Sequence, residues 1–207
     1  VKMNNTFAII GYSGHSYVII DSASKIGLNC TGYYDVNIKK TNPLDIDYLG
    51  SENSIISEKK VFISIGNNRI RRNVYESLIK NKFVTFINIW DPTSSISKYA
   101  FIKPNSLISI GVNSVVNSLA QIDTGAIINT GAIIEHEVKI GKFSHVGPNA
   151  TVCGDAIIGE NVFIGANAVI KQCVNIGDNS IIGAGSVVLN NVPANTTYVG
   201  NPAEKMK

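Results

Sequence analysis

Residues 127–170 read IINTGAIIEHEVKIGKFSHVGPNATVCGDAIIGENVFIGANAVI, with an aliphatic residue at every sixth position. The period extends from Ile110 to Val188, where fourteen consecutive sixth residues are Ile or Val. The residue four positions after each of them is always Ser, Ala or Val. A period of six fits neither a helix nor a plain strand, but it is typical of a parallel β-helix, in which each hexapeptide supplies a short strand and a corner. We therefore predict a β-solenoid with the large aliphatics inside.

The number of hexapeptides sets the size of the predicted solenoid. Three of them make one triangular turn, so residues 110–193 should form about four to five turns. Ile96, Ile102 and Ile108 continue the period upstream and add about one turn, but they are two residues out of phase with the later set. We expect a bulge or short insertion near Ile108. Gly directly follows the aliphatic in seven of the fourteen repeats, which suggests tight corners there.

The first ninety residues follow a different pattern, in which short apolar runs alternate with helical periodicity. Strands are expected at 7–10, 30–34, 61–65 and 85–90, and helices at 14–26 and 69–81. The second helix carries Ile70, Val74 and Leu78 on one face, which we expect to be buried. This alternation predicts a small Rossmann-like α/β domain with a mainly parallel sheet.

A break at Asp91-Pro92 marks the predicted domain boundary. We therefore expect an α/β domain at residues 1–92 and the solenoid at residues 93–207.

The composition narrows the functional classes. A net charge of +3 over 207 residues, without a basic run interleaved with aromatics, gives no reason to expect nucleic-acid binding. Apolar runs are too short for a membrane span, and the N-terminal sequence lacks a signal-peptide layout. The three widely spaced cysteines fit reduced thiols better than a disulfide framework. We expect a cytoplasmic protein that does not interact with membranes.

A candidate anion site lies between the first predicted strand and helix, in Gly11-Tyr-Ser13-Gly14-His15. Such a turn presents backbone N–H groups and a helix N-terminus to an anion, usually a phosphate. Asp35 ends the next strand, where an acid commonly binds a ribose hydroxyl, and Gly66 ends the third. These residues favour a nucleotide site, and a tight turn without a ligand is the alternative. The full G-x-G-x-x-G pattern is absent, which disfavours NAD.

A second candidate site lies in the solenoid, which holds two of the three histidines, His136 and His145. Neither occupies the large interior position, so both are expected to reach the surface. Glu137 directly follows His136, and a carboxylate beside an imidazole can fix its tautomer and favour its role as a general base. Two solvated polar residues on a corner are the structural alternative. We expect no metal, because the spacing is not that of a zinc site.

These elements together resemble the bacterial sugar acyltransferases with a left-handed β-helix. The subgroup includes UDP-4-amino-sugar N-acetyltransferases and sialic acid O-acetyltransferases. The resemblance covers nearly the whole chain, and it rests on the turn at 11–15, the segment Ile65-Gly-Asn-Asn68, Ile134-Glu-His-Glu137, His145 and the terminal Val199-Gly-Asn-Pro-Ala203. It implies the left hand of the helix, a homotrimer with the coenzyme groove between subunits, and acetyl-CoA as co-substrate without a metal.

The resemblance also implies roles for individual residues. In the solenoid, His136 would be the general base with Glu137 as its partner, and Asn129 would help to position the acceptor. The coenzyme would contact His145, the Gly154 backbone, and Ala166 and Ala184, which are one turn apart. In the first domain, the nucleotide part of the sugar would contact Ser13, Gly14, His15, Asp35 and Gly66. Val36 stands where relatives can have an acid, which leaves the ribose or uridine contact at that position open.

The sequence thus predicts an acetyl-CoA-dependent N-acetyltransferase acting on a nucleotide-linked amino sugar in bacterial glycan biosynthesis. A UDP-4-amino-4,6-dideoxy sugar is the first expectation for the acceptor. The enzymatic alternative is O-acetylation of a sialic acid or another sugar hydroxyl. A non-catalytic trimeric scaffold is the alternative from another class, because fold alone does not fix function.

Overall fold

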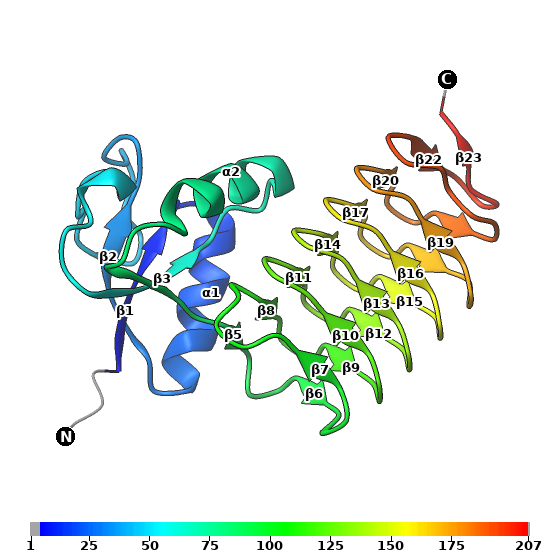
Figure 1. Ribbon diagram of the computed structural model, residues 1–207, viewed down its shortest axis with the longest axis horizontal. Helices are drawn as coiled ribbons and strands as arrows, with labels where there is room; N and C mark the ends of the chain where they lie inside the picture. Colours follow the sequence, from blue (N-terminus) through cyan, green and yellow to red (C-terminus); the bar gives the residue numbers. More distant parts are fainter. Residues whose placement is uncertain (1–4, 207) are drawn as a thin grey trace.

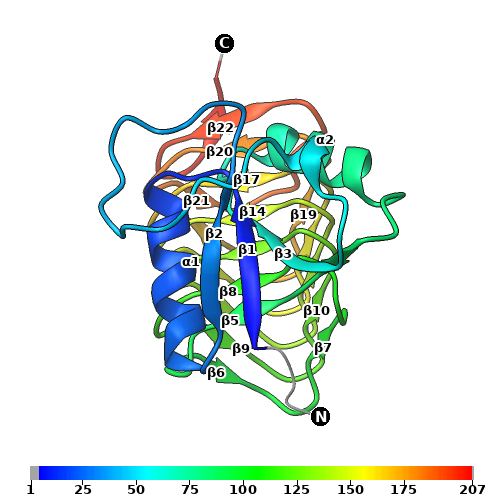
Figure 2. The same ribbon diagram turned by 90° about the vertical axis from the view of Figure 1, so that its left-hand side faces the viewer.

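A computed structural model describes residues 5–206 and shows an α/β domain beside a triangular solenoid (Figure 1). The α/β domain has a four-stranded parallel sheet in the order β2-β1-β3-β4, of which β2, β1 and β3 are seen side by side in Figure 2. Its strands are β1 (Thr6–Ile10), β2 (Asn29–Tyr34), β3 (Lys59–Ile63) and β4 (Val84–Phe86). Its helices are α1 (Gly14–Lys25), α2 (Asn68–Leu78) and the short 3₁₀ helix η1 (Glu52–Ser54). The predicted α/β class and parallel sheet are confirmed.

The predicted strand at 85–90 is wrong, because the structure divides this stretch between two sheets. β4 ends at Phe86, and Ile89–Trp90 form β5, which pairs with the solenoid. Between them, the Asn88 side chain accepts hydrogen bonds from the N–H groups of Ser106 and Ile108 and donates one to Lys103 O. These bonds tie residue 88 to the solenoid backbone. The apolar run alone gave no signal that the chain changes sheets within it.

The solenoid has three parallel faces and about six turns. The eight-stranded face contains β5 (Ile89–Trp90), β8 (Ser109–Ile110), β11 (Ile127–Ile128), β14 (His145–Val146), β17 (Phe163–Ile164), β20 (Ile181–Ile182), β22 (Thr197–Val199) and the antiparallel β23 (Glu204–Lys205). The six-stranded face contains β6 (Ser95–Ile96), β9 (Val115–Val116), β12 (Ile133–Ile134), β15 (Thr151–Val152), β18 (Val169–Ile170) and β21 (Val187–Val188). The five-stranded face contains β7 (Phe101–Ile102), β10 (Gln121–Ile122), β13 (Lys139–Ile140), β16 (Ile157–Ile158) and β19 (Asn175–Ile176).

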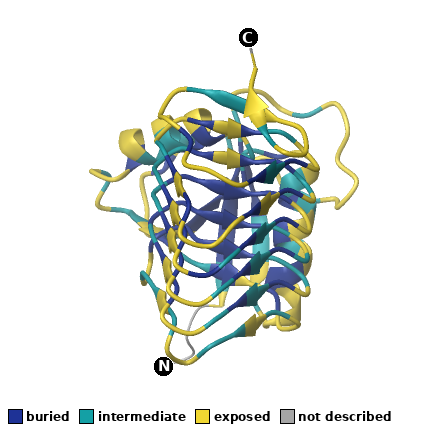
Figure 3. Ribbon diagram, turned by 90° about the vertical axis from the view of Figure 1, so that its right-hand side faces the viewer, coloured by how far each residue is buried: buried dark blue, intermediate teal, exposed yellow. Residues whose placement is uncertain are grey.

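The repeat residues fill the interior as predicted. All fourteen sixth-position aliphatics are at most 2% exposed, and the small residues four positions later are buried as well. Figure 3 shows the coils stacked one above another, with their buried segments in dark blue. The predicted insertion is also confirmed. The strand at Ile102 is followed by one at Ile110, eight residues later, while Leu107 turns into the core of the α/β domain.

The corners are made differently from the expectation. The glycines after the aliphatics do not adopt left-handed backbone conformations; instead a Cβ there would contact the next turn, as at Gly165, 2.5 Å from Ala184 N. The left-handed residue comes two positions later in every repeat from Asn113 to Gly185. Asn is frequent at that position, which suits its tolerance of positive φ. The glycine therefore allows the turns to stack closely, and the residue two positions later makes the bend of the chain.

Two buried polar groups fasten the α/β domain to the solenoid. The first is Arg71 of α2, which is fully buried and donates to five oxygens on both domains: Ile65 O, Gly66 O, Asn68 Oδ1, Gly125 O and Phe143 O. Ile70, expected on the buried face, is 50% exposed. Arg71 takes the inward position with Val74 and Leu78, at the spacing i, i+3, i+7.

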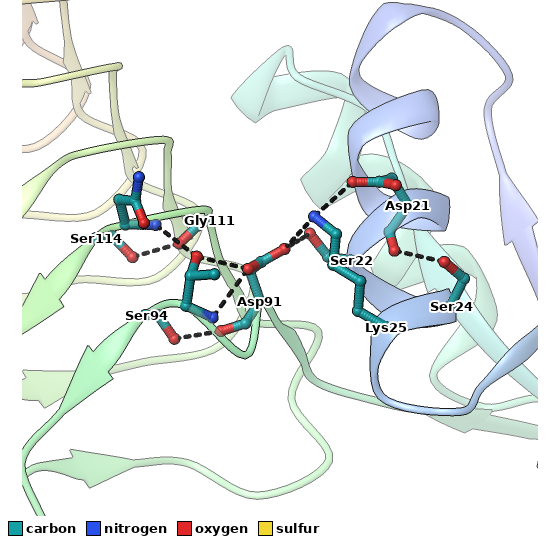
Figure 4. A network of polar contacts seen from close by, with 10 residues as sticks. Asp21, Ser22, Ser24, Lys25, Asp91, Ser94, Gly111 and Ser114 are labelled. Atoms are coloured by element: carbon teal, nitrogen blue, oxygen red, sulfur yellow. Dashed lines mark hydrogen bonds and ion pairs between the residues drawn. The ribbon is translucent and has the colours of Figure 1, made fainter.

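The second group is Asp91, buried where the solenoid begins (Figure 4). One carboxylate oxygen accepts from Ser22 Oγ at 2.8 Å and Lys25 Nζ at 3.0 Å on α1, and the other accepts from Thr93. Burial alone would raise the pKa of Asp91, but the hydrogen bonds from Thr93, Lys25 and Ser22 outweigh it and hold that pKa below its ordinary value. The ionised carboxylate is therefore the form that joins the domains.

We predict that Asp91 makes the stability of the protein depend on acid pH. Because the folded pKa of Asp91 is below the unfolded one, its ionisation stabilises the fold above about pH 4, and this stabilisation is lost as the pH falls through the folded pKa. Urea unfolding at several pH values should show Asp91→Asn less stable than the parent at pH 7, with the gap narrowing below about pH 4. Asp21→Asn, which removes an exposed partner of Lys25, is the matched control and should change little. A gap that does not change with pH would contradict the assignment.

Candidate functional site

A cavity of about 340 Å³ opens at the carboxyl edge of the α/β sheet. It is lined by the ends of β1, β2 and β3, and it brings together the predicted residues Ser13, Asp35 and Gly66. The cavity is also lined by Val36, Lys39, Glu52, Asn67 and Val74. The sequence pattern did not identify Lys39 or Glu52, because both lie outside any strand-to-helix turn.

The turn after β1 is shaped for close approach. Gly11 has φ +85°, and a Cβ at this position would lie 2.6 Å from Ile65 Cγ1. Ser13 precedes α1, and its backbone N–H donates to Ser16 Oγ at 2.9 Å. Gly14 begins the helix with open space beside it. Serine at position 16, where a dinucleotide fingerprint has glycine, therefore serves the start of the helix.

Asp35 holds the end of β2 against this turn. Its Oδ2 accepts from Tyr12 N at 3.1 Å and from Lys39 Nζ at 2.8 Å, while its Oδ1 accepts from Val36 N at 2.8 Å. Both oxygens thus have protein partners, and a ribose hydroxyl would add to these bonds through the remaining lone pairs. The carboxylate is fixed at the centre of the cavity wall.

His15 does not line this cavity but faces the solenoid. Its ring lies 6.4 Å from that of His145, and its Nε2 is buried. Burial, with a smaller contribution from the Arg71 charge, lowers the pKa of His15 to about 4. His15 is therefore neutral at physiological pH, at the boundary of the two domains.

His145 projects outward from β14 as predicted, but the α/β domain covers it, so it is buried. Its Nε2 lies 3.1 Å from Asn129 Nδ2, and its Nδ1 lies 3.3 Å from Gly66 O. Asn129 Oδ1 accepts from Thr130 N, which leaves its amino group to donate to His145. The proton of His145 is therefore on Nδ1. Burial, with smaller contributions from Arg71 and His15, lowers the pKa of His145 to about 3.

A second groove, of about 450 Å³, continues from the cavity along the eight-stranded face. Gly66 and Asn67 line both hollows, so the two are joined at the end of β3. The groove is also lined by Arg69, His145 and Phe163, and no carboxylate lines it. The two hollows together extend from the sheet edge to His145.

His136 and Glu137 lie elsewhere, on a corner between the six-stranded and five-stranded faces. His136 Nδ1 is 3.1 Å from Glu137 Oε2, and the two side chains are 61% and 55% exposed. With Nδ1–H donating to the carboxylate, the neutral ring keeps its Nε2 lone pair free. Glu137 occupies the left-handed corner position with φ +64°. His136 is therefore a solvent-facing base whose tautomer is fixed by Glu137.

Gly154 lies one turn after His136 on the same corner. A Cβ on Gly154 would be 2.5 Å from His136 Cε1, so the imidazole packs directly over this glycine. The Gly154 N–H has no hydrogen-bond partner among residues 5–206. This N–H and the imidazole therefore occupy the same corner.

Ala166 and Ala184 stack on the adjacent corner, between the eight-stranded and six-stranded faces, where Gly185 N donates to Ala166 O at 2.8 Å. Asn129 lies on this second corner as well. Apart from His145, which lies on β14, the solenoid candidates thus occupy two corners that border the six-stranded face.

No group of three or more His, Cys, Asp or Glu side chains is placed to hold a metal ion within residues 5–206. No helix in this part of the chain is long and apolar enough to span a membrane.

Both domains match known families. Residues 6–78 match the PglD N-terminal domain, and residues 137–172 and 155–190 match the bacterial transferase hexapeptide (six repeats). The first match spans β1 to α2, and the second begins beside His136.

Solved structures are similar over nearly the whole chain. PerB from Caulobacter crescentus, crystallised with CoA and GDP-perosamine, is 26% identical with a TM-score of 0.90, covering 98% of this chain and 97% of that one. The acetyltransferase domain of PglB from Neisseria gonorrhoeae, in complex with acetyl coenzyme A, is 27% identical with a TM-score of 0.89, covering 99% and 100%. WeeI from Acinetobacter baumannii, at 23% identity and a TM-score of 0.76, covers 97% and 100% and shares the fold. The solenoid is a left-handed parallel β-helix.

We predict that Gly154→Ala displaces the His136 imidazole without unfolding the protein. Gly154 is not in the left-handed region, so alanine fits the backbone, and its methyl group meets only the ring. The stability should stay within about 1 kcal/mol of the parent. Imidazole ¹H–¹⁵N spectra should show shifted His136 resonances, with those of His15 and His145 unchanged as internal controls. Unmoved His136 resonances would show that the contact is absent in solution.

Proposed function

We infer that this chain is an acetyl-CoA-dependent sugar N-acetyltransferase of the left-handed β-helix superfamily. The observation that carries the inference is the combination of a PglD-type N-terminal domain with the exposed His136–Glu137 pair on a hexapeptide solenoid. The similarity to PerB and to the PglB acetyltransferase domain over the whole chain supports it. The co-substrate is acetyl-CoA, and the chemistry requires no metal.

The proposed acceptor is a nucleotide-linked 4-amino-4,6-dideoxy sugar used in bacterial glycan biosynthesis. The nucleotide would lie in the cavity at the sheet edge, with the phosphates at the turn of Ser13, Gly14 and His15 and the ribose near Asp35. The sugar would extend past Gly66, from this cavity into the groove beside His145. Because the His15 ring faces the solenoid with its Nε2 buried, the backbone of His15 rather than its ring is the part that would contact the phosphates.

The proposed reaction is direct attack of the sugar amine on the thioester. His136 Nε2 takes a proton from the amine as the C–N bond forms, and the C–S bond then breaks. The imidazolium returns the proton to the CoA thiolate, which leaves as the thiol. Glu137 positions the ring and stabilises its charged form, and the Gly154 N–H is suited to bind the thioester oxygen as its charge develops.

The proposed assembly is a homotrimer with the active site between subunits. Within one chain, the α/β domain covers the eight-stranded face, whereas His136 lies on the corner between the other two faces. A sugar bound at the α/β domain therefore reaches the His136 of a neighbouring subunit more directly. Asn129 and His145 would lie on the acceptor and acetyl side of this site, and Ala166 and Ala184 would line the groove for the coenzyme. A cytoplasmic location is part of the proposal, in keeping with three free cysteines.

We predict that His136→Ala lowers kcat by about 10²–10⁴-fold, the usual contribution of a general base. Thiol release from acetyl-CoA with nucleotide-linked 4-amino sugars measures the rate, and a thermal shift with acetyl-CoA checks that the coenzyme still binds. Glu137→Gln should reduce kcat less, because the ring keeps a hydrogen-bond acceptor. A near-normal kcat for His136→Ala would remove this residue from the mechanism.

The same assay separates the rival functions. Turnover with sialic acid alone would identify an O-acetyltransferase, in which the same base would act on a hydroxyl. No turnover together with no acetyl-CoA binding would favour a non-catalytic scaffold, because a ligand at 100 times its Kd should stabilise the protein by about 2.7 kcal/mol.

We predict that two defective variants complement each other in mixed trimers. His136→Ala damages the solenoid part of the site and Asp35→Ala the nucleotide part. In a randomly mixed trimer about a quarter of the intersubunit sites would combine two intact halves. Coexpressed variants, assayed at low substrate, should therefore regain about a quarter of the parental activity. Activity no higher than the average of the two separate variants would place each site within one chain.

A further inference from the structure

We propose that the nucleotide cavity selects a guanine base and that Glu52 recognises it. This inference rests on the proposed function, and it replaces the uridine diphosphate expected from the sequence. Glu52 is the first residue of η1 and lines the cavity with Asp35 and Val36.

The order of groups along the cavity places Glu52 next to the nucleobase of a bound nucleotide. The phosphate-binding turn at Ser13 follows the central strand β1, and Asp35 follows the neighbouring edge strand β2. Tyr12 N donates to Asp35 Oδ2, and Asp35 N donates to Gly50 O at 3.1 Å, which sets the segment leading to Glu52 beyond Asp35. A nucleotide with its phosphate at the turn and its ribose at Asp35 directs its base toward Val36, Glu52 and Val74.

Glu52 is the available carboxylate of the cavity. Both oxygens of Asp35 already accept hydrogen bonds, and the Lys39 ammonium is held by Asp35 at 2.8 Å. The Glu52 side chain has no hydrogen bond or ion pair to any residue of the described range 5–206. The backbone that carries Glu52 is nevertheless anchored, because Ile55, three residues later, is buried in the α/β core and its carbonyl accepts from Asn81 Nδ2. Glu52 thus brings to the cavity a carboxylate that has no partner among residues 5–206.

The chemistry of a carboxylate distinguishes among the bases. A carboxylate only accepts hydrogen bonds, and it has two oxygens side by side. Guanine offers two adjacent donors, N1–H and the 2-amino group, which match both oxygens. Uracil and thymine offer one N–H between two carbonyl oxygens, and those oxygens would face the carboxylate unfavourably. Adenine and cytosine each offer one amino group beside a ring acceptor. Guanine is therefore the base that fits Glu52.

Two apolar residues that line the cavity with Glu52 suit the faces of a purine. Val36 lines the cavity and is largely exposed, and Val74 of α2 lines the same cavity. Aliphatic side chains here can cover the face of a purine, which is larger than a pyrimidine, while the Glu52 carboxylate accepts hydrogen bonds from the edge of the ring. The acceptor class would then be a guanosine-diphosphate-linked amino sugar.

The test is calorimetric binding of GDP, IDP and UDP to the full-length protein without acetyl-CoA. GDP should bind at least about tenfold tighter than UDP, the size expected for a bidentate contact to a base. IDP lacks the 2-amino group and should bind with intermediate affinity. Glu52→Gln should weaken GDP binding about tenfold and leave UDP binding within about twofold. Glu58→Gln makes the same change near the opposite end of β3 and should leave all three affinities unchanged.

Three outcomes would overturn the inference: UDP binding as tightly as GDP, Glu52→Gln weakening both nucleotides equally, or no binding of any nucleotide. Binding is measured without turnover, so the result is independent of acetyl transfer. GDP preference without thiol release would keep the base assignment and reject the proposed reaction. Thiol release with UDP-linked sugars alone would keep the reaction and reject guanine.

Discussion

The arrangement of both domains depends on one buried guanidinium. Arg71 has five N–H donors, and each has an oxygen partner: two at the end of β3, one on Asn68 and two on solenoid corners. Burial lowers its pKa to about 9, so the charge remains at neutral pH without a carboxylate beside it. A buried charge is tolerated only when all its donors are satisfied, so this cluster of carbonyls can hold arginine but no shorter side chain. The relative position of the domains is set by that requirement.

The same guanidinium connects the nucleotide cavity to the solenoid. Gly66 O accepts from Arg71 and lies next to His145 Nδ1, and His145 Nε2 continues the network to Asn129. Gly66 also lines both the cavity and the groove. Arg71 and His145 therefore hold the segment that follows β3, where the cavity and the groove meet. Asp91 makes a second attachment at the other end of the boundary, so the domains are joined at two separated points.

The sequence predicted the features that repeat or that belong to one local motif. The six-residue period, the insertion before Ile110, the parallel α/β sheet and the grouping of Ser13, Asp35 and Gly66 all follow from local patterns. Contacts between the domains carry no such pattern. Arg71 was missed because an arginine beside Ile70 reads as a solvated residue, and the burial of His145 depends on a domain more than fifty residues away in sequence. Glu52 was missed because it lies in an irregular segment, where position is set by tertiary contacts such as that of Ile55.

The hairpin of β22 and β23 affects how one edge of the solenoid can pair with another copy at high protein concentration. A stack of parallel coils ends in a row of free backbone groups, which invites another copy to add by strand pairing. Here the chain reverses after β22, and β23 runs antiparallel at the edge of the eight-stranded face. The reversed direction and the charged Glu204–Lys205 pair present a poor template for the next coil. The reversal thus disfavours the pairing of another copy at this edge of the eight-stranded face.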